Sequence, residues 1–160
     1  PMSLQPRHLY LIQQTGTEMT GRFNHDFKGC SDTYATLCIY HDEMPSAQIS
    51  SILDIFPDDT VEKGSKLALT TAQQNGWFYG SQDRLESLDL GAHIQWIIDQ
   101  LKNKRDELEL LVDKGCEIQI MCYWGSAYGN GGPVLDHQLI SDLGEIPTDL
   151  YLDVWFDEGS

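Results

Sequence analysis

Few residues in this sequence have the types and spacing that catalysis requires. His41-Asp42-Glu43 and Asp136-His137 place an imidazole beside a carboxylate. Sequence neighbours on a strand or at a helix end usually point in different directions, so this spacing favours neither a metal site nor a catalytic triad. There is no His-Glu-x-x-His motif, no nucleophile elbow and no paired-carboxylate cleft. We therefore expect a protein that is not an enzyme and that has no catalytic, cofactor-binding or metal-binding residues.

A glycine-rich segment from Gly125 to Gly132 is the other feature that could hold a ligand. It lacks the Gly-Lys-Ser/Thr ending of a P-loop and the Gly-x-Gly-x-x-Gly order of a dinucleotide site. Asp136 opens the helix expected after it, and a carboxylate there would oppose a bound anion. A long, flexible hairpin-like loop with Tyr128 at its middle is favoured over a phosphate cradle.

The four cysteines, at positions 30, 38, 116 and 122, form no Cys-x-x-Cys pair. Cys38 and Cys122 fall inside expected strands, where a free thiol usually behaves as a small buried apolar group. A metal site or a disulfide framework would need tighter, paired spacing. We therefore expect four free thiols and a cytoplasmic protein.

The charge of the chain is strongly negative. The 160 residues include 25 Asp and Glu against 10 Lys and Arg, a formal net charge of −15, and 41% are hydrophobic, which is ordinary for a globular domain. We expect no membrane span, because no apolar run is long enough. The electric field of so negative a chain repels nucleic acid and anionic membranes and attracts basic partners. Solubility alone is the simpler explanation of the charge.

One long amphipathic helix followed by a strand should organise the fold. Apolar residues recur at three- and four-residue spacing from Leu88 onwards, and Lys114 and Gly115 end the pattern. The segment from Cys116 to Trp124 then alternates as a strand does. The apolar stripe of the helix consists of Leu90, Ile94, Ile97, Ile98, Leu101, Leu108, Leu111 and Val112.

Shorter elements surround this pair. Residues 34–41 and 150–156 alternate as strands. A short helix should carry Ile49, Ile52, Leu53 and Phe56, with Pro45 in its first turn and Pro57 as its stop. The remaining expectations are a polar loop over 57–64, strands over 66–72 and 77–81 joined by Asn75-Gly76, a helix from the N-cap Asp136 to Gly144, and a loose hairpin of 8–12 with 21–23.

The expected order of strand, helix, two strands, helix and strand is that of the ferredoxin-like unit. We therefore expect an α/β (α+β) protein. Residues 34–156 should form a single ferredoxin-like βαββαβ domain with a C-terminal helix–strand extension, and residues 1–33 an N-terminal extension. The strand from Cys116 should lie beside the strand over 34–41 and parallel to it.

Six short motifs support the same fold. They are Tyr34-Ala-Thr-Leu-Cys-Ile39, the loop from Pro57 to Lys63-Gly64, Gly76-Trp77, Ile94-x-Trp96-x-x-x-x-Leu101, Gly131-Gly132-Pro133 and Leu150-Tyr-Leu-Asp-Val-Trp155. Over roughly residues 34 to 156 the chain resembles a family of small bacterial proteins named domain of unknown function 4279. The resemblance implies the fold and brings no established catalytic residues.

The sheet should have one aromatic and polar face. If the helices cover the face that carries the aliphatic residues, the alternate residues of each strand look the other way. Tyr40, Tyr123, Tyr151 and Trp155 should then lie together on that second face. Residues 1–33 or the last helix are its most plausible cover; a second copy of the chain or a protein partner are the alternatives. Base stacking by nucleic acid is disfavoured, because nothing basic is there to hold phosphates.

These features favour a non-catalytic acidic protein-binding module, such as an immunity or antitoxin protein that neutralises a basic partner such as a toxin; self-association is the other possibility. The expected partner-binding residues are Tyr40, Tyr123, Tyr151 and Trp155, with Asp58, Asp59 and Glu62 in one loop and Asp153, Asp157 and Glu158 near the C-terminus. The alternative is a small-molecule-binding protein or enzyme that uses the Tyr128 loop with Trp77 and Tyr79 as walls.

Overall fold

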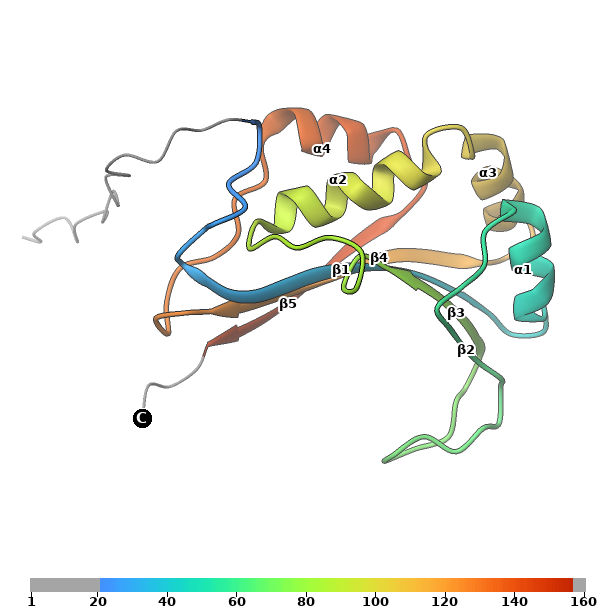
Figure 1. Cartoon of the computed structure of the whole chain (residues 1–160). Coiled ribbons are helices and arrows are strands. Elements are labelled where there is room, and N and C mark those ends of the chain that lie inside the picture. Colours follow the sequence, from blue (N-terminus) through green and yellow to red (C-terminus); the bar gives the residue numbers. More distant parts are fainter. Residues whose placement is uncertain (1–20, 157–160) are drawn as a thin grey trace, which may run out of the picture.

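The computed structural model describes residues 21–156, which form one five-stranded sheet and four helices (Figure 1). The expected hairpin of 8–12 with 21–23 rests on residues 1–20, outside the described part of the chain. The elements in chain order are β1 (Cys30–His41), α1 (Ser46–Leu53), β2 (Asp59–Val61), β3 (Asn75–Gly80), α2 (Leu90–Leu101), α3 (Arg105–Asp113), β4 (Glu117–Ser126), α4 (His137–Gly144) and β5 (Asp149–Phe156).

The sheet has the strand order β2-β3-β1-β4-β5. The first four strands pair antiparallel and form the expected ferredoxin-like unit, and β5 extends it by pairing parallel to β4. The expected parallel pairing of β4 with β1 is wrong, because Tyr34 and Tyr123 face each other in an antiparallel ladder. The helical crossover makes β4 parallel to β3, and β1 lies between these two strands, so it must run opposite to both.

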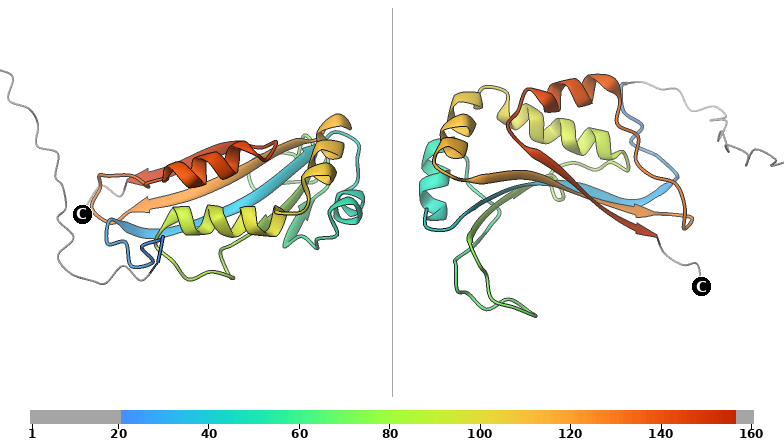
Figure 2. Two further views of the ribbon diagram at one scale, coloured as in Figure 1. Left: turned by 90° about the horizontal axis from the view of Figure 1, so that it is seen from above. Right: turned by 180° about the vertical axis from the view of Figure 1, so that it is seen from behind.

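All four helices lie on one side of this sheet (Figures 1 and 2). Between the helices and the sheet is a buried apolar core, in which Leu37, Ile39 and Ile120 of the strands meet Ile94 and Ile97 of α2. The division of strand residues between two faces follows the sequence prediction. Strand β5 is only partly covered: Leu150 and Val154 pack against the core, but Leu152 and Phe156 stay largely exposed.

The long helix expected from Leu88 to Lys114 is two helices, so that prediction is wrong. Asp89 caps α2 by accepting a hydrogen bond from the Gly91 N–H, and α2 ends at Leu101. The break at residues 102–104 lets α3 turn and pack beside α1 at the end of the sheet (Figure 1). The seven-residue spacing of Leu101 and Leu108 is the spacing of two turns of an unbroken helix, so periodicity gave no sign of the break.

The end of α3 matches the sequence prediction. Gly115 has φ +91°, the left-handed conformation that favours glycine. Its N–H binds the carbonyl oxygen of Val112 at 2.8 Å, and the Cys116 N–H binds that of Leu111 at 2.9 Å. This is the Schellman arrangement, and it turns the chain directly into β4.

The region from α1 to β3 differs from the prediction in three ways. The helix α1 ends at Leu53 because Asp54 adopts φ 53°, so Phe56 lies outside it and is 88% exposed. Residues 66–72 are not a strand: a reversal at residues 67–70 makes them the tip of a hairpin arm between β2 and β3. Asn75-Gly76 therefore starts β3 instead of forming the turn, and β2 occupies part of the expected polar loop.

The four cysteines are free, as the sequence predicts, and burial extends to all four, beyond the two expected inside strands. Burial raises the pKa of the Cys122 thiol to about 12, and it also raises the pKa of Cys38. In the β1–β4 ladder Cys38 lies opposite Gln119, and Cys122 lies opposite Ala35. The side chains of the two cysteines therefore lie on opposite faces of the sheet.

Thiol titration should reflect this burial. In denaturant and without reductant, an aromatic disulfide reagent is expected to count four thiols. In the native protein the reaction should be slower by orders of magnitude, because the thiolate is the reactive form and burial suppresses it. A count of two in denaturant would contradict the four free thiols.

Candidate functional site

The face of the sheet that looks away from the helices carries aromatic and acidic side chains. Three of the expected aromatic residues come together on its β4–β5 half. Tyr123 is paired with Asp153, and the neighbouring rows place Tyr151 beside Met121 and Trp155 beside Gly125. We call this surface the open face; its exposed or half-buried aromatic and acidic residues are Asp32, Tyr34, Tyr40, Asp59, Phe78, Glu117, Tyr123, Asp149, Tyr151, Asp153 and Trp155.

Tyr34 and Tyr123 form the centre of this group. Their rings stack with centroids 5.1 Å apart and an interplanar angle of 18°. Burial raises the pKa of Tyr34, and the charges of Asp32 and Asp153 nearby raise it further. Tyr34 was not among the expected partner-binding residues. The register of β1 against β4 was the missing information, because an antiparallel ladder puts Tyr34 directly opposite Tyr123.

Tyr40 lies at the other end of the open face, so the structure does not bring it together with Tyr123. Its partner in the ladder is Glu117, which lies six residues along β4 from Tyr123. At about 3.3 Å per residue, Tyr40 and Tyr123 are therefore separated by roughly 20 Å. There it packs edge-on against Phe78, with centroids 5.7 Å apart. Burial raises the pKa of Tyr40 to about 12. The aromatic residues thus form two clusters on one face.

The acidic residues of the open face have no basic neighbours on its strands. The strand positions that face this side include Asp32, Asp59, Glu117, Asp149 and Asp153 and contain no Lys or Arg. Of the expected acidic cluster Asp58, Asp59 and Glu62, one carboxylate is already paired within the protein. Asp58 accepts hydrogen bonds from Arg84 Nη1 at 2.8 Å and from the Gly80 N–H at 2.7 Å, which lower its pKa and make it a structural group. Asp59 and Glu62 remain exposed. Asp157 and Glu158 lie outside the described residues.

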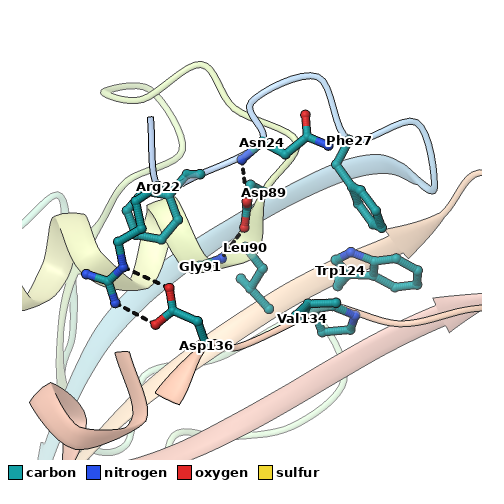
Figure 3. A pocket seen from close by; sticks show the side chains of 11 residues that line it. Arg22, Asn24, Phe27, Asp89, Leu90, Gly91, Trp124, Val134 and Asp136 are labelled. Atoms are coloured by element: carbon teal, nitrogen blue, oxygen red, sulfur yellow. Dashed lines mark hydrogen bonds and ion pairs between the residues drawn. The ribbon is translucent and has the colours of Figure 1, made fainter. Parts of the chain in front are cut away.

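No described segment lies across the open face. Residues 21–29 run along the helix side of the sheet instead: the Asn24 N–H binds Asp89 at 2.7 Å, and Arg22 pairs with Asp136 (Figures 1 and 3). Helix α4 lies in the helix layer too. The described part of residues 1–33 and the last helix are therefore not the cover that the sequence suggested. Tyr151 is 56% exposed and Trp155 59% exposed.

The alternative site also has a different geometry from the one expected. Ser126 ties the glycine-rich loop by accepting hydrogen bonds from the N–H groups of Tyr128 and Asn130. Trp77 is fully buried and donates to Ser50 Oγ at 2.9 Å. It is paired with Ile39, whereas Ser126 at the start of the loop is paired with Cys30, roughly 30 Å away along β1. The structure does not bring the loop together with Trp77 or with Tyr79.

Other residues flank this loop. Trp124 precedes it and Pro133 and Val134 follow it, and these three line a pocket of about 200 Å³ at the start of α2 (Figure 3). Phe27 and Phe23 from the segment before β1 complete its apolar wall. No signal in the sequence pointed to this pocket, because four separate stretches of the chain form it.

Ser81 and His93 form a hydrogen-bonded pair that resembles part of a catalytic triad. Ser81 Oγ lies 2.7 Å from His93 Nδ1, and His93 Nε2 lies 3.0 Å from the Ser87 carbonyl oxygen. The carbonyl can only accept, so Nε2 carries the proton and Nδ1 accepts from the serine. Both residues are buried, with 0% and 1% exposure, and Ser81 also accepts from the Ala35 N–H. The pair connects α2 to β1.

This pair should make stability depend on pH. Burial lowers the pKa of His93 below the ordinary value of 6.5. The unfolded chain therefore binds a proton more readily, so the free energy of unfolding should fall as pH drops below about 6.5, by up to about 1.4 kcal/mol per pH unit. Denaturant unfolding at pH 8 and pH 5 measures this loss, and His93→Gln should reduce the difference. An unchanged difference in His93→Gln would contradict the assignment.

The remaining polar candidates have structural roles. His41 Nδ1 accepts from the Glu43 and Met44 N–H groups, and Asp136 caps α4 by accepting from the Leu139 N–H. Within residues 21–156 no three His, Cys, Asp or Glu side chains gather as metal ligands would. None of the described helices has both the length and the apolar character needed to cross a membrane.

In comparisons with known proteins, residues 31–157 match the model of a family described as "Domain of unknown function (DUF4279)". No curated protein and no solved structure gives a significant match.

Proposed function

The chain belongs to the family described as Domain of unknown function (DUF4279), and we propose that it is a non-catalytic protein-binding module that holds a basic partner against the open face of its sheet. The observation that carries the proposal is the composition of this face. Half-exposed Tyr and Trp side chains alternate there with carboxylates. Tyr and Trp are the residues that interfaces favour, and a large bare aromatic cluster is a liability for a protein that stays alone.

Charge supports a basic partner over a second copy of the chain. Each copy has a formal net charge of −15. In a face-to-face dimer the carboxylates of the two open faces would lie against each other and repel. A basic protein would instead be attracted over a distance of about one Debye length, roughly 10 Å at ordinary salt. An immunity or antitoxin protein that neutralises a basic toxin in the cytoplasm has this chemistry.

The shape of the molecule agrees with such a role. The hairpin arm between β2 and β3 extends on the open-face side of the sheet (Figure 1). At its tip Leu69 is fully exposed and Leu67 is 44% exposed. Apolar side chains at the tip of an arm would be buried by a partner that fills the space beside it.

Photo-crosslinking in cells tests the proposal and can identify the partner at the same time. A photoreactive amino acid in place of Tyr151, on the open face, is expected to trap a basic protein. The same residue in place of Leu110, which is 44% exposed on α3, should trap none. The proposal fails if both positions trap the same proteins, if the trapped protein is acidic, or if position 151 traps only a second copy of the chain.

Charge reversal at one residue should slow the binding of that partner. Asp153→Lys changes two charge units on the open face, and each unit is worth about 1 kcal/mol at 4 Å in water, so association should slow by up to roughly 30-fold. Asp113→Lys is the control, because Asp113 is exposed at the end of α3 and its substitution changes the net charge by the same amount. Association rates at low and high salt measure the effect. Equal slowing by both variants would show that net charge alone acts.

A further inference from the structure

Asparagine followed by glycine occurs twice in the chain, in opposite surroundings. Asn75-Gly76 begins β3, and Asn130-Gly131 lies in the glycine-rich loop after β4. In such a pair the backbone nitrogen of the glycine can attack the side-chain amide of the asparagine. A glycine has no Cβ to obstruct this approach, and its backbone reaches conformations that other residues rarely adopt. The fold decides which of the two pairs can react.

The fold holds Asn75 in place. Its side chain is buried, and Nδ2 donates to the Met44 carbonyl oxygen at 3.0 Å while Oδ1 accepts from the Lys63 N–H at 2.8 Å. Gly76 is paired with Tyr40 on one side and with β2 on the other, so its backbone lies inside the sheet. The Asn75 amide can meet the Gly76 nitrogen only when these bonds open together, which a central part of a sheet does rarely.

The side chain of Asn130 has no such restraint. It is exposed, and its amide makes no hydrogen bond with any described residue. Within residues 21–156 the Gly131 N–H has no acceptor either, and Gly131 has φ +95°. Gly129 precedes the pair and Gly132 follows it, so the backbone on both sides is free to adjust.

Ser126 makes the Gly131 nitrogen a better nucleophile. Ser126 Oγ donates a hydrogen bond to the Asn130 carbonyl oxygen at 2.7 Å. This oxygen and the Gly131 nitrogen belong to one peptide group, in which electrons are shared by resonance. Negative charge that forms on the nitrogen when it loses its proton therefore spreads to the oxygen, where the hydroxyl stabilises it. Ser126 Oγ also accepts from the Asn130 N–H at 3.0 Å, so it holds the backbone of Asn130 and leaves the side chain free.

We propose that Asn130 is a site of spontaneous deamidation, with water as the only co-reactant. The Gly131 nitrogen loses its proton to solvent and forms a bond to Asn130 Cγ. The bond from Cγ to Nδ2 breaks, and Nδ2 takes up a proton and leaves as ammonia. Water then opens the cyclic imide at either of its two carbonyl groups, and the products at position 130 are isoaspartate and aspartate.

This reaction gives the loop a carboxylate that the sequence does not encode. It makes the formal net charge of −15 more negative by one unit. In the isoaspartate product the backbone also runs through the former side chain, which changes the path of the loop that Ser126 ties. The loop lies beyond the end of β4 and off the open face, so the proposal is independent of the proposed protein partner.

Ageing of the intact protein tests the site, with Asn75 as the internal control. The full chain would be incubated at physiological temperature and pH and digested at mildly acidic pH, and loss of the amide at each asparagine would be followed by mass spectrometry. In the native protein Asn130 should react at least about tenfold faster than Asn75, because Asn75 reacts only in locally opened molecules. In denaturant the two rates should agree within about threefold, because the fold no longer distinguishes them.

Two variants connect the reaction to the charge of the undigested protein. Ion-exchange chromatography should show an acidic form that grows as Asn130 reacts. Asn130→Gln keeps an amide but lengthens the side chain, so ring closure loses its favourable geometry and the acidic form should grow at least about tenfold more slowly. Asn103→Gln, at another exposed asparagine, should leave its growth unchanged.

Three results would overturn the proposal. Asn130 could keep its amide in the native protein and lose it in denaturant, which would mean that the loop prevents ring closure. Asn75 could react as fast as Asn130 in the native protein, which would mean that the fold does not select the site. The acidic form could also grow in Asn130→Gln as it does in the wild type, and its charge would then come from another residue.

Discussion

Trp77→Ala is expected to lower the free energy of unfolding by about 3–5 kcal/mol, whereas Trp155→Ala should change it by less than about 1 kcal/mol. The two substitutions remove the same side chain from different environments. Trp77 is fully buried, donates to Ser50 and packs beside Tyr79 with centroids 6.1 Å apart. Trp155 is 59% exposed on β5.

Equilibrium denaturation of the two variants at pH 8 measures this difference. A cavity the size of an indole cannot be refilled by small shifts of the neighbouring core, so most of the loss at Trp77 should persist. A loss of several kcal/mol in Trp155→Ala would mean that the open face is ordinary core covered by another part of the chain. The interface proposal would then be wrong.

Tyr123→Asp is expected to weaken partner binding by about 30-fold or more, which corresponds to a hot-spot loss of at least about 2 kcal/mol. Tyr123 lies at the centre of the larger aromatic cluster, stacked on Tyr34 and paired with Asp153. The new carboxylate would remove the stack and would be desolvated beneath the partner. The fold should survive, with a cost of about 1–2 kcal/mol, because Tyr123 is only half-buried.

Tyr128→Asp is the matched control for this prediction. Tyr128 is 68% exposed in the glycine-rich loop, which lies beyond the end of β4 and off the open face. Dissociation constants for the crosslinked partner should therefore fall into two classes, with Tyr128→Asp near the wild type. If Tyr128→Asp weakened binding and Tyr123→Asp did not, the loop would be the site. If Tyr123→Asp unfolded the protein, the open face would be core.

The alternation of strand residues was visible in the sequence because its physical cause is local. Along β1, β4 and β5 apolar residues alternate with more polar ones, and this pattern correctly assigned Tyr123, Tyr151 and Trp155 to one face and Ile120 and Leu37 to the other. The caps were visible for the same reason. Asp136 and Gly115 act through hydrogen bonds within a few residues of themselves.

The features that the sequence did not show depend on contacts between distant segments. The register between β1 and β4 puts Tyr34, not Tyr40, beside Tyr123, and no local pattern states a register. The break after Leu101 allows α3 to reach α1, which precedes it by about 50 residues. The turn at residues 67–70 replaced the expected one because Asn75 is held inside the sheet, where its side chain donates to the Met44 carbonyl and accepts from the Lys63 N–H.

The open face and the Trp124 pocket show the same contrast between features with a local cause and features that need contacts between distant segments. The acidic and aromatic character of the open face could be predicted, because it follows from residue types on alternating strands. The pairing of Asp58 with Arg84 could not, because these two residues are 26 positions apart and meet only when β2 and β3 pair. The Trp124 pocket needs residues 22–27, 89–91 and 133–136 to converge, and their sequences carry no common motif.

Hydroxyl-radical footprinting of the complex tests the open-face interface most directly. Oxidation rates of exposed side chains would be measured by mass spectrometry in the free protein and in the complex with the crosslinked partner. The account predicts that Trp155 and Tyr151 become protected, while Phe56, which is 88% exposed beyond α1, keeps its rate. Unchanged rates at Trp155 and Tyr151 together with protection at Phe56 would place the partner elsewhere and contradict the account.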